Sequence, residues 1–232
     1  MAVVAIHQPT FFPWLGYFDK IAKSDVFVIL DSVQAPKKGG SWLNRVKLAI
    51  NGEARWVTAP IERTYHGVKR VDDIEFTTTA WREQVLKTVV SAYGRADHYR
   101  DVMPLIEPLV RNPEANLSRF NQHTITTLAR TLKLDPGKIV LSSSLGLDSA
   151  SNDLLADITR AVGGQTYLCG GGASEYFDER PFAAAGIAVR YQNFVHPQYS
   201  QPPAEQMIAG LSVIDALMHC GSDVVSGWFT SR

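Results

Sequence analysis

A histidine and a glutamine follow the first apolar run of the chain. His7 and Gln8 come directly after residues 3–6, and a turn that holds two prolines and Trp14 comes next. A histidine at the end of a strand can act as a general base near neutral pH or bind a phosphate. We predict that His7 is catalytic and that Gln8 and Trp14 bind the substrate. The alternative is a structural histidine that fixes the turn by hydrogen bonding.

A carboxylate and a run of serines also end apolar segments. Segment 25–31 closes with an aspartate, and three serines follow residues 138–141. Hydroxyl and backbone N–H groups before a helix suit an anionic ligand, and with His7 they could wrap a triphosphate. An ordinary loop that leads into a helix is the alternative. The predicted substrate-binding residues of this group are Asp31, Ser142, Ser143 and Ser144.

The residues Asn51-Gly52 separate two β-prone runs, which is the strongest short signal for a hairpin. Alternate residues of a strand point to opposite faces, so Arg45 and Lys47 share one face. A guanidinium can hold a phosphate or a carboxylate in a bidentate fork. We predict that Asn44, Arg45 and Lys47 bind the anionic end of a substrate. A solvated strand face is the alternative.

A run of three glycines follows Cys169 at the end of the expected strand 165–168. Gly170, Gly171 and Gly172 have no side chain to keep a ligand away, so we predict that their backbone contacts substrate. They do not form the dinucleotide-binding pattern G-x-G-x-x-G, and a flexible turn is the alternative. Cys169 would be a nucleophile only if its pKa were lowered, and a buried inert thiol is the favoured interpretation.

Three polar residues farther along complete the predicted pocket. Asp178 is the second predicted catalytic residue, which orients or deprotonates an amine, and its alternative role is to cap a helix. Tyr176 and His196 are predicted to bind substrate. The other histidines lack the spacing of metal ligands, so we predict no metal site.

Short apolar runs that alternate with helical patterns must position these residues. The expected strands are residues 3–6, 25–31, 138–141, 165–168 and 187–191. Two strands joined by a helix over residues 15–22 form a βαβ unit, whose strands are parallel. Asp31 should then lie on the same edge of the sheet as His7. We predict an α/β fold with a mostly parallel, Rossmann-like sheet flanked by helices.

Two segments depart from that alternation, within what we expect to be a single domain over residues 1–232. A β-hairpin insertion covers residues 42–60, and an all-helical subdomain covers residues 79–133. Pro104 and Pro108 are expected to break or kink this helical block. Thr79, Asn116 and Ser151 are expected to cap helices, and a last helix is expected over residues 209–218.

The composition limits the class of protein. Lys and Arg total 23 and Asp and Glu total 23 of 232 residues, so the formal net charge is zero. We therefore expect neither a nucleic-acid partner nor an anionic membrane surface. Two cysteines are too few for a disulfide framework, and no segment has the roughly 20 apolar residues of a membrane span. A cytoplasmic protein is the expectation.

Several blocks of sequence occur in a fixed order along the chain. They are Ile-His-Gln-Pro at 6–9 with Pro-Trp-Leu-Gly-Tyr at 13–17, Leu-Asp-Ser-Val-Gln at 30–34, Asn-Arg-Val-Lys at 44–47 with Trp-Val-Thr-Ala-Pro at 56–60, Ser-Ser-Ser-Leu at 142–145, the glycine block at 167–172 with Tyr-Phe-Asp at 176–178, and His-Pro-Gln-Tyr at 196–199. Together they resemble the WbqC-like protein family over nearly the whole chain. The resemblance implies that such proteins are encoded in bacterial gene clusters for O-antigen, surface polysaccharides and secondary metabolites. It also implies transferases that act on an amine or on an activated acyl or aminoacyl group.

Three functions remain open at this point. The first is a biosynthetic transferase that joins an acyl or aminoacyl group to the amine of an amino sugar or a secondary-metabolite intermediate, with an acyl-CoA or an acyl carrier protein thioester as donor. The second is a nucleotide-dependent ligase or nucleotidyltransferase that holds ATP and Mg²⁺ between His7 and the serine run. The third is a non-catalytic partner in a biosynthetic complex.

Overall fold

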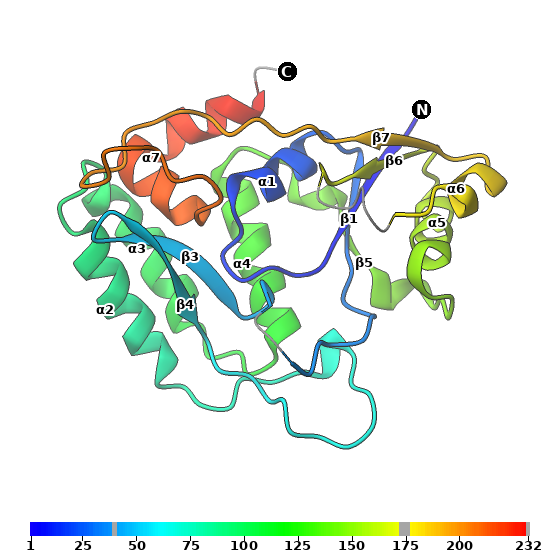
Figure 1. Ribbon diagram of the computed structural model, residues 1–232, viewed down its shortest axis with the longest axis horizontal. Coiled ribbons are helices and arrows are strands. Elements are labelled where there is room, and N and C mark those ends of the chain that lie inside the picture. Colours follow the sequence, from blue (N-terminus) through cyan, green and yellow to red (C-terminus); the bar gives the residue numbers. More distant parts are fainter. Residues whose placement is uncertain (39–40, 172–176, 231–232) are drawn as a thin grey trace.

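The main sheet of the molecule has five parallel strands and lies in the right-hand half of Figure 1. The computed structural model describes residues 1–38, 41–171 and 177–230. The strands lie in the order β5-β2-β1-β6-β7, with bounds β1 Val3–His7, β2 Val26–Ile29, β5 Ile139–Leu141, β6 Thr166–Cys169 and β7 Ala188–Tyr191. Every adjacent pair is parallel. Counted in chain order, this is 3-2-1-4-5, the order of the first five strands of a Rossmann sheet, and it confirms the predicted fold class.

Helices cover both faces of the sheet because its strands are apolar on both sides. Ala5 and Phe27 pack with α1, α4 and α7 on one face, whereas Val4 and Val28 pack with α5 and α6 on the other (Figure 1). Side chains alternate along a strand, so His7 points to the α1 face. The helix bounds are α1 Leu15–Ala22, α4 Leu117–Thr131, α5 Ser151–Ala161, α6 Arg180–Ala184 and α7 Val213–Thr230.

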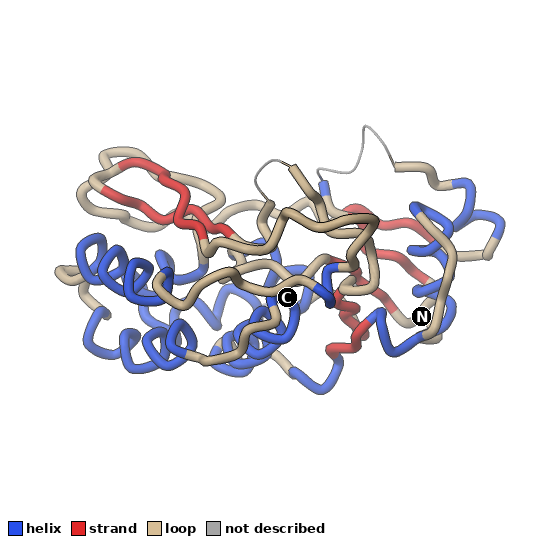
Figure 2. The backbone as a smooth tube through the Cα atoms, turned by 90° about the horizontal axis from the view of Figure 1, so that it is seen from below, coloured by secondary structure: helices blue, strands red, loops and turns tan. Residues whose placement is uncertain are grey.

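The predicted hairpin is confirmed as a separate two-stranded sheet, which Figure 2 shows apart from the five-stranded one. Its strands are β3 Arg45–Ile50 and β4 Glu53–Thr58. The turn residues Asn51 and Gly52 have φ values of 52° and 76°, as a tight hairpin turn with two left-handed residues requires. Val46 and Leu48 are buried, whereas Arg45 and Lys47 lie on the opposite, half-buried face.

The helical block consists of α2 Trp81–Tyr93, α3 Tyr99–Arg111 and α4. Pro104 and Pro108 were predicted to break or kink this block, and they do not break it, because α3 runs through both prolines. Both prolines lie on the exposed side of α3, while Val102 and Ile106 are buried in the core. Burial of that apolar stripe stabilises the helix against the loss of two backbone hydrogen bonds, each of which costs about 1 kcal/mol.

The helix ends follow the predictions in part. Asn116 caps α4 as expected, since its side chain accepts a hydrogen bond from the Arg119 N–H. Thr79 and Ser151 do not cap helices through their side chains, because α2 begins at Trp81 and α5 begins at Ser151 itself. The last helix starts later than expected and extends to Thr230, with a break at Gly221, where φ is 77°.

Short 3-10 helices cover Val71–Asp73, Pro136–Lys138 and Ser142–Leu145. Within the described ranges, none of the helices has the length and apolar character needed to cross a bilayer.

Candidate functional site

The carboxyl ends of β1 and β6 lie side by side at the point where the sheet changes its winding direction. The register pairs Ala5 with Leu168, which places His7, the last residue of β1, next to Gly170, the residue that follows β6. After β1 the chain turns to α1 on one face, and after β6 it continues to α6 on the other. In doubly wound sheets, ligands bind in the crevice at this switch point. The polar groups at these two strand ends are therefore candidates for ligand binding.

The His7 imidazole is held in one orientation. Its Nδ1 lies 3.0 Å from Gln8 O, and since a carbonyl can only accept, Nδ1 carries the hydrogen. The ring packs edge-on against Tyr17 and Trp14, at centroid separations of 4.9 and 5.3 Å. Burial, together with the charge of Lys20, lowers the pKa of His7 from 6.5 to about 4. The imidazole is therefore neutral at pH 7, with Nε2 as its acceptor atom.

Lys20 reaches the same corner from α1 and was not among the predicted site residues. It is only 4% exposed, and its Nζ donates a hydrogen bond of 3.1 Å to Ile6 O. A Cβ placed on Gly170 would lie 3.7 Å from this Nζ. Among the residues that the structure describes, no carboxylate oxygen lies within 4.0 Å of the Lys20 ammonium. Burial lowers the pKa of Lys20 from 10.5 to about 8.

We call the group formed by His7, Lys20, Cys169 and Gly170 the lysine corner. Cys169 is fully buried, and burial raises the pKa of its thiol. A protonated thiol is a weak nucleophile, so the reactive groups of the lysine corner are the imidazole and the amine. The glycine contributes a bare stretch of backbone directly in front of the amine.

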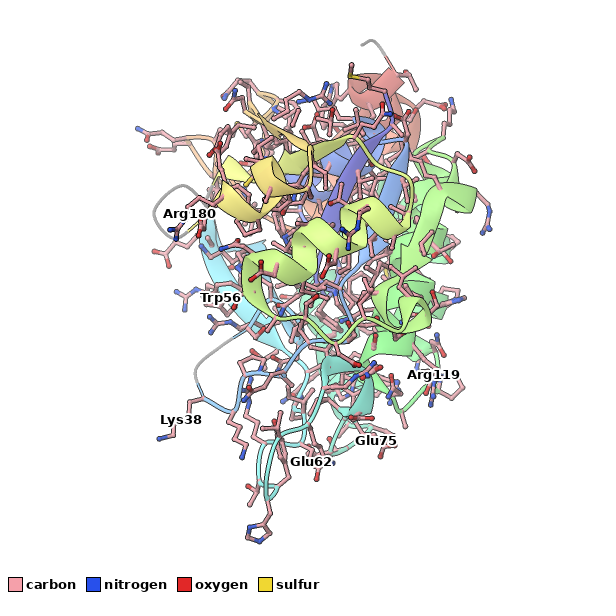
Figure 3. The ribbon with its side chains drawn as sticks, turned by 90° about the vertical axis from the view of Figure 1, so that its right-hand side faces the viewer. Lys38, Trp56, Glu62, Glu75, Arg119 and Arg180 are labelled. Atoms are coloured by element: carbon pink, nitrogen blue, oxygen red, sulfur yellow. The ribbon has the colours of Figure 1, made fainter. Side chains whose placement is uncertain are left out.

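A row of aromatic rings connects the lysine corner to the hairpin, and we call it the aromatic row. From His7 it runs through Trp14 and Trp42 to Trp56, with centroid separations of 5.3, 5.3 and 4.8 Å. Arg45 Cζ lies 3.9 Å from the centroid of the Trp56 ring, and Lys47 Nζ lies 5.1 Å from the same centroid. Figure 3 shows Trp56 at the edge of the molecule, where it is 38% exposed. The fold thus brings two of the three predicted hairpin residues into line with His7.

Asp31 and the serine run lie at the ends of β2 and β5, and they bind one another. The Asp31 carboxylate accepts hydrogen bonds from Ser142 Oγ at 3.0 Å and from the Ser143 N–H and Oγ at 2.9 Å each. Ser144 Oγ donates to Leu141 O at 2.7 Å. These contacts join two neighbouring strand ends that are 111 residues apart in sequence. They leave little free hydrogen-bonding capacity for a ligand.

Asn44 is also committed to internal contacts. Its side chain is buried, donates to Ala59 O at 2.7 Å and accepts from Arg63 at 3.3 Å. It therefore holds the two ends of the hairpin segment together. Its neighbour Arg45 remains the better group for an anion, because Arg45 Nε has no hydrogen-bond partner among the described residues.

The predicted residues after β6 are less well suited to base catalysis. Asp178 pairs with Arg180 at 2.7 Å and accepts its backbone N–H, and these contacts lower the pKa of the carboxyl group. His196 stacks near Tyr199, and its Nε2 is buried without a partner among the described residues. Gly172 and Tyr176 lie outside the described residues, and Gly171 is exposed.

A pocket of about 840 Å³ opens on the other face of the strand ends. Gln8, Ser32 and Arg70 line it together with residues around the start of α5. We call it the rim pocket. Because His7 points to the α1 face and Gln8 lines the α5 side, the two residues predicted at the end of β1 serve different surfaces.

A model of the WbqC-like protein family matches residues 8–226, a range that begins directly after His7 and includes the end of β6 and the hairpin. The chain belongs to this family. It is also similar to the uncharacterized protein Rv1507c of Mycobacterium tuberculosis, with 25% identity over 228 residues and 96% of each chain covered. No solved structure matches it. The kinship expected from the sequence blocks is thus confirmed.

One sequence signal in this WbqC-like chain could have pointed to Lys20. The short helix α1 is buried from Leu15 to Ile21, so it offers no solvated side to a cation within it. Lys20 lies between two of its apolar residues, Phe18 and Ile21, in that segment. A lysine in a short helix whose other residues, apart from Asp19, are apolar, aromatic or small is a candidate functional group, because an unpaired buried charge is costly.

Proposed function

We propose that the protein is a small-molecule transferase that joins an acyl or aminoacyl group to an amine. The observation that carries this proposal is the fixed, neutral imidazole of His7 at the switch point of the sheet. With Nδ1 bonded to Gln8 O, Nε2 is left as a proton acceptor for an incoming amine. A base in hydrogen-bond reach of the attacking nitrogen is what amide formation requires.

In the proposed reaction the amine nitrogen attacks the acyl carbon, and the new C–N bond forms. A proton of the amine passes to Nε2 of His7. The bond between the acyl carbon and its leaving group then breaks, and the leaving group takes the electron pair and the proton that His7 received. Amide and protonated leaving group are released, and the imidazole is neutral again.

The aromatic row supports a donor that extends from the lysine corner toward the hairpin. Ring faces bind apolar or planar groups, and the cations over Trp56 suit an anionic group at the far end. An acyl-CoA or the thioester of an acyl carrier protein combines a reactive acyl end with a distant phosphate. We therefore propose a thioester of this kind as the donor.

The test is an acyl-transfer assay with acetyl-CoA and a panel of primary amines that includes glucosamine. We expect one free thiol for each amide that mass spectrometry detects. His7→Gln should lower the rate by roughly 100-fold or more, because it removes the base. His66→Gln, at an exposed histidine on a surface loop, is the matched control and should keep the wild-type rate. Equal rates for the two variants would refute the role of His7.

A nucleotide-dependent ligase is the second candidate, because the strand order 3-2-1-4-5 and the rim pocket are features of nucleotide-binding α/β proteins. Against it stands the mutual bonding of Asp31 with Ser142 and Ser143, which occupies the predicted phosphate-binding hydroxyls. This candidate predicts that millimolar ATP with Mg²⁺ raises the melting temperature. An unchanged melting temperature would eliminate it.

A further inference from the structure

Lys20 is a buried cation with too few partners. An ammonium has three N–H donors, and the described residues supply one acceptor, Ile6 O. Arg82, which is also buried, shows the usual solution: it donates to the carbonyls of Asn112 and Glu114 at 2.9 Å each and packs over Trp81. Lys23, one turn along, pairs with Asp19 at 2.9 Å. Among the described residues, Lys20 thus has neither the two carbonyl acceptors of Arg82 nor the carboxylate partner of Lys23.

The backbone in front of Lys20 leaves room for a group to approach. A Cβ built on Gly170 would meet only Nζ and Cε of Lys20 within 4 Å, at 3.7 and 3.9 Å, among the described residues. The position is therefore open from the glycine side, and its φ lies outside the left-handed region that favours glycine. An atom group of about methyl size fits between this backbone and the amine.

Lys20 also lies at the edge of the sheet where ligands bind in folds of this kind. Ile6 lies near the end of β1 and Gly170 directly follows β6, at the switch point of the sheet. A buried charge without a counter-ion is destabilising, and proteins keep such groups mainly where function requires them. The missing partner must be negative and must bring oxygen acceptors for the two remaining N–H groups.

We propose that Lys20 binds an anionic oxygen group of the substrate, a carboxylate or a phosphate, between Gly170 and the end of β1. This proposal rests on the proposed function in one respect only, namely that the bound anion lies next to the reacting acyl group. The bound anion compensates the positive charge that acts on His7, so the imidazole becomes a stronger base when substrate is present. Lys20 is then a substrate-binding residue that also couples binding to catalysis.

Anion binding is tested on the full chain without donor or amine. The melting temperature is measured with sodium phosphate, with sodium acetate and with sodium chloride at equal ionic strength and pH. We expect phosphate or acetate to raise the melting temperature above the chloride value, and the responding anion identifies the class. Lys20→Met should abolish this rise, while Lys23→Met should retain it. The same rise in Lys20→Met, or no rise with either anion in the wild type, would overturn the proposal.

A second pair of variants tests the space in front of the amine. Gly170→Ala places a methyl group 3.7 Å from Nζ and should reduce the anion-dependent rise. Gly227→Ala on α7, whose Cβ would meet no atom of the described residues within 4 Å, is the control and should not reduce it. NMR titration of the His7 ring gives an independent measure. The responding anion should raise the pKa of His7 in the wild type and leave it unchanged in Lys20→Met. If the protein passes these tests but forms no amide, the anion site is supported and the proposed transferase function is wrong.

Discussion

Replacing Lys20 with methionine is expected to stabilise the protein near neutral pH. Burial lowers the pKa of Lys20 from 10.5 to about 8, and this difference corresponds to about 3 kcal/mol at about 1.4 kcal/mol per pKa unit. The lost hydrogen bond to Ile6 O costs about 1 kcal/mol in return. Methionine has nearly the length of the lysine stem and fills the same space. The net gain in the free energy of unfolding should be about 2 kcal/mol at pH 7.

This gain should depend on pH in a defined direction. The folded-state pKa lies below the unfolded value, so the wild-type penalty is complete below pH 8 and disappears above pH 10.5. At pH 9.5 about 1.4 kcal/mol of the penalty remains, which the lost hydrogen bond nearly cancels. The advantage of the variant should therefore fall from about 2 kcal/mol to near zero between pH 7 and pH 9.5.

Urea unfolding at these two pH values measures both quantities. Lys23→Met is the matched control, because it removes a half-exposed lysine of the same helix that pairs with Asp19. It should lose less than about 1 kcal/mol at either pH. A Lys20→Met variant that is less stable than the wild type at pH 7, or equally stabilised at both pH values, would contradict the argument that the Lys20 charge is buried without compensation.

Two further predictions concern His7 and Asp31. The pKa of His7 falls from 6.5 unfolded to about 4 folded, so its contribution to stability is complete above pH 6.5 and is lost as the pH falls toward 4, by about 3 kcal/mol in all. Between pH 7.5 and 4.5 the wild type should therefore lose about 2 to 3 kcal/mol more than His7→Gln in urea unfolding, and parallel losses would disprove the assigned burial. Asp31→Ala should cost about 3 kcal/mol, because three hydrogen-bond donors lose their acceptor. Ser144→Ala, with one local hydrogen bond, should cost about 1 kcal/mol, and a similar cost for both would show that the bonds between β2 and β5 do not matter.

The strands and the hairpin could be predicted because their signals are local. Continuous apolar runs mark strands that are buried on both faces, and each of the five predicted runs overlaps a strand of the sheet. The Asn51-Gly52 pair predicts its turn because both residues tolerate a positive φ. The path of α3 through Pro104 and Pro108 could not be predicted in this way, because it depends on the burial of Val102 and Ile106 against other helices.

The candidate site was predictable only where topology alone places a residue. His7 lies at the carboxyl end of β1, and a βαβ unit is enough to put it on the ligand-binding edge of the sheet. That Asp31 would be occupied by Ser142 and Ser143 depends on β5 lying next to β2, which no local pattern specifies. The aromatic row likewise exists only because the hairpin folds back over the turn that carries Trp14.

The amino-acid sequence by itself determined the elements of this protein, its family and the position of one imidazole at a strand end. Only the tertiary structure decided which polar groups remain available for a ligand. The charge state and reactivity of His7 and Lys20 depend on burial and on neighbours from distant segments. Such surroundings are created by packing, so they have no counterpart in the order of residues along the chain.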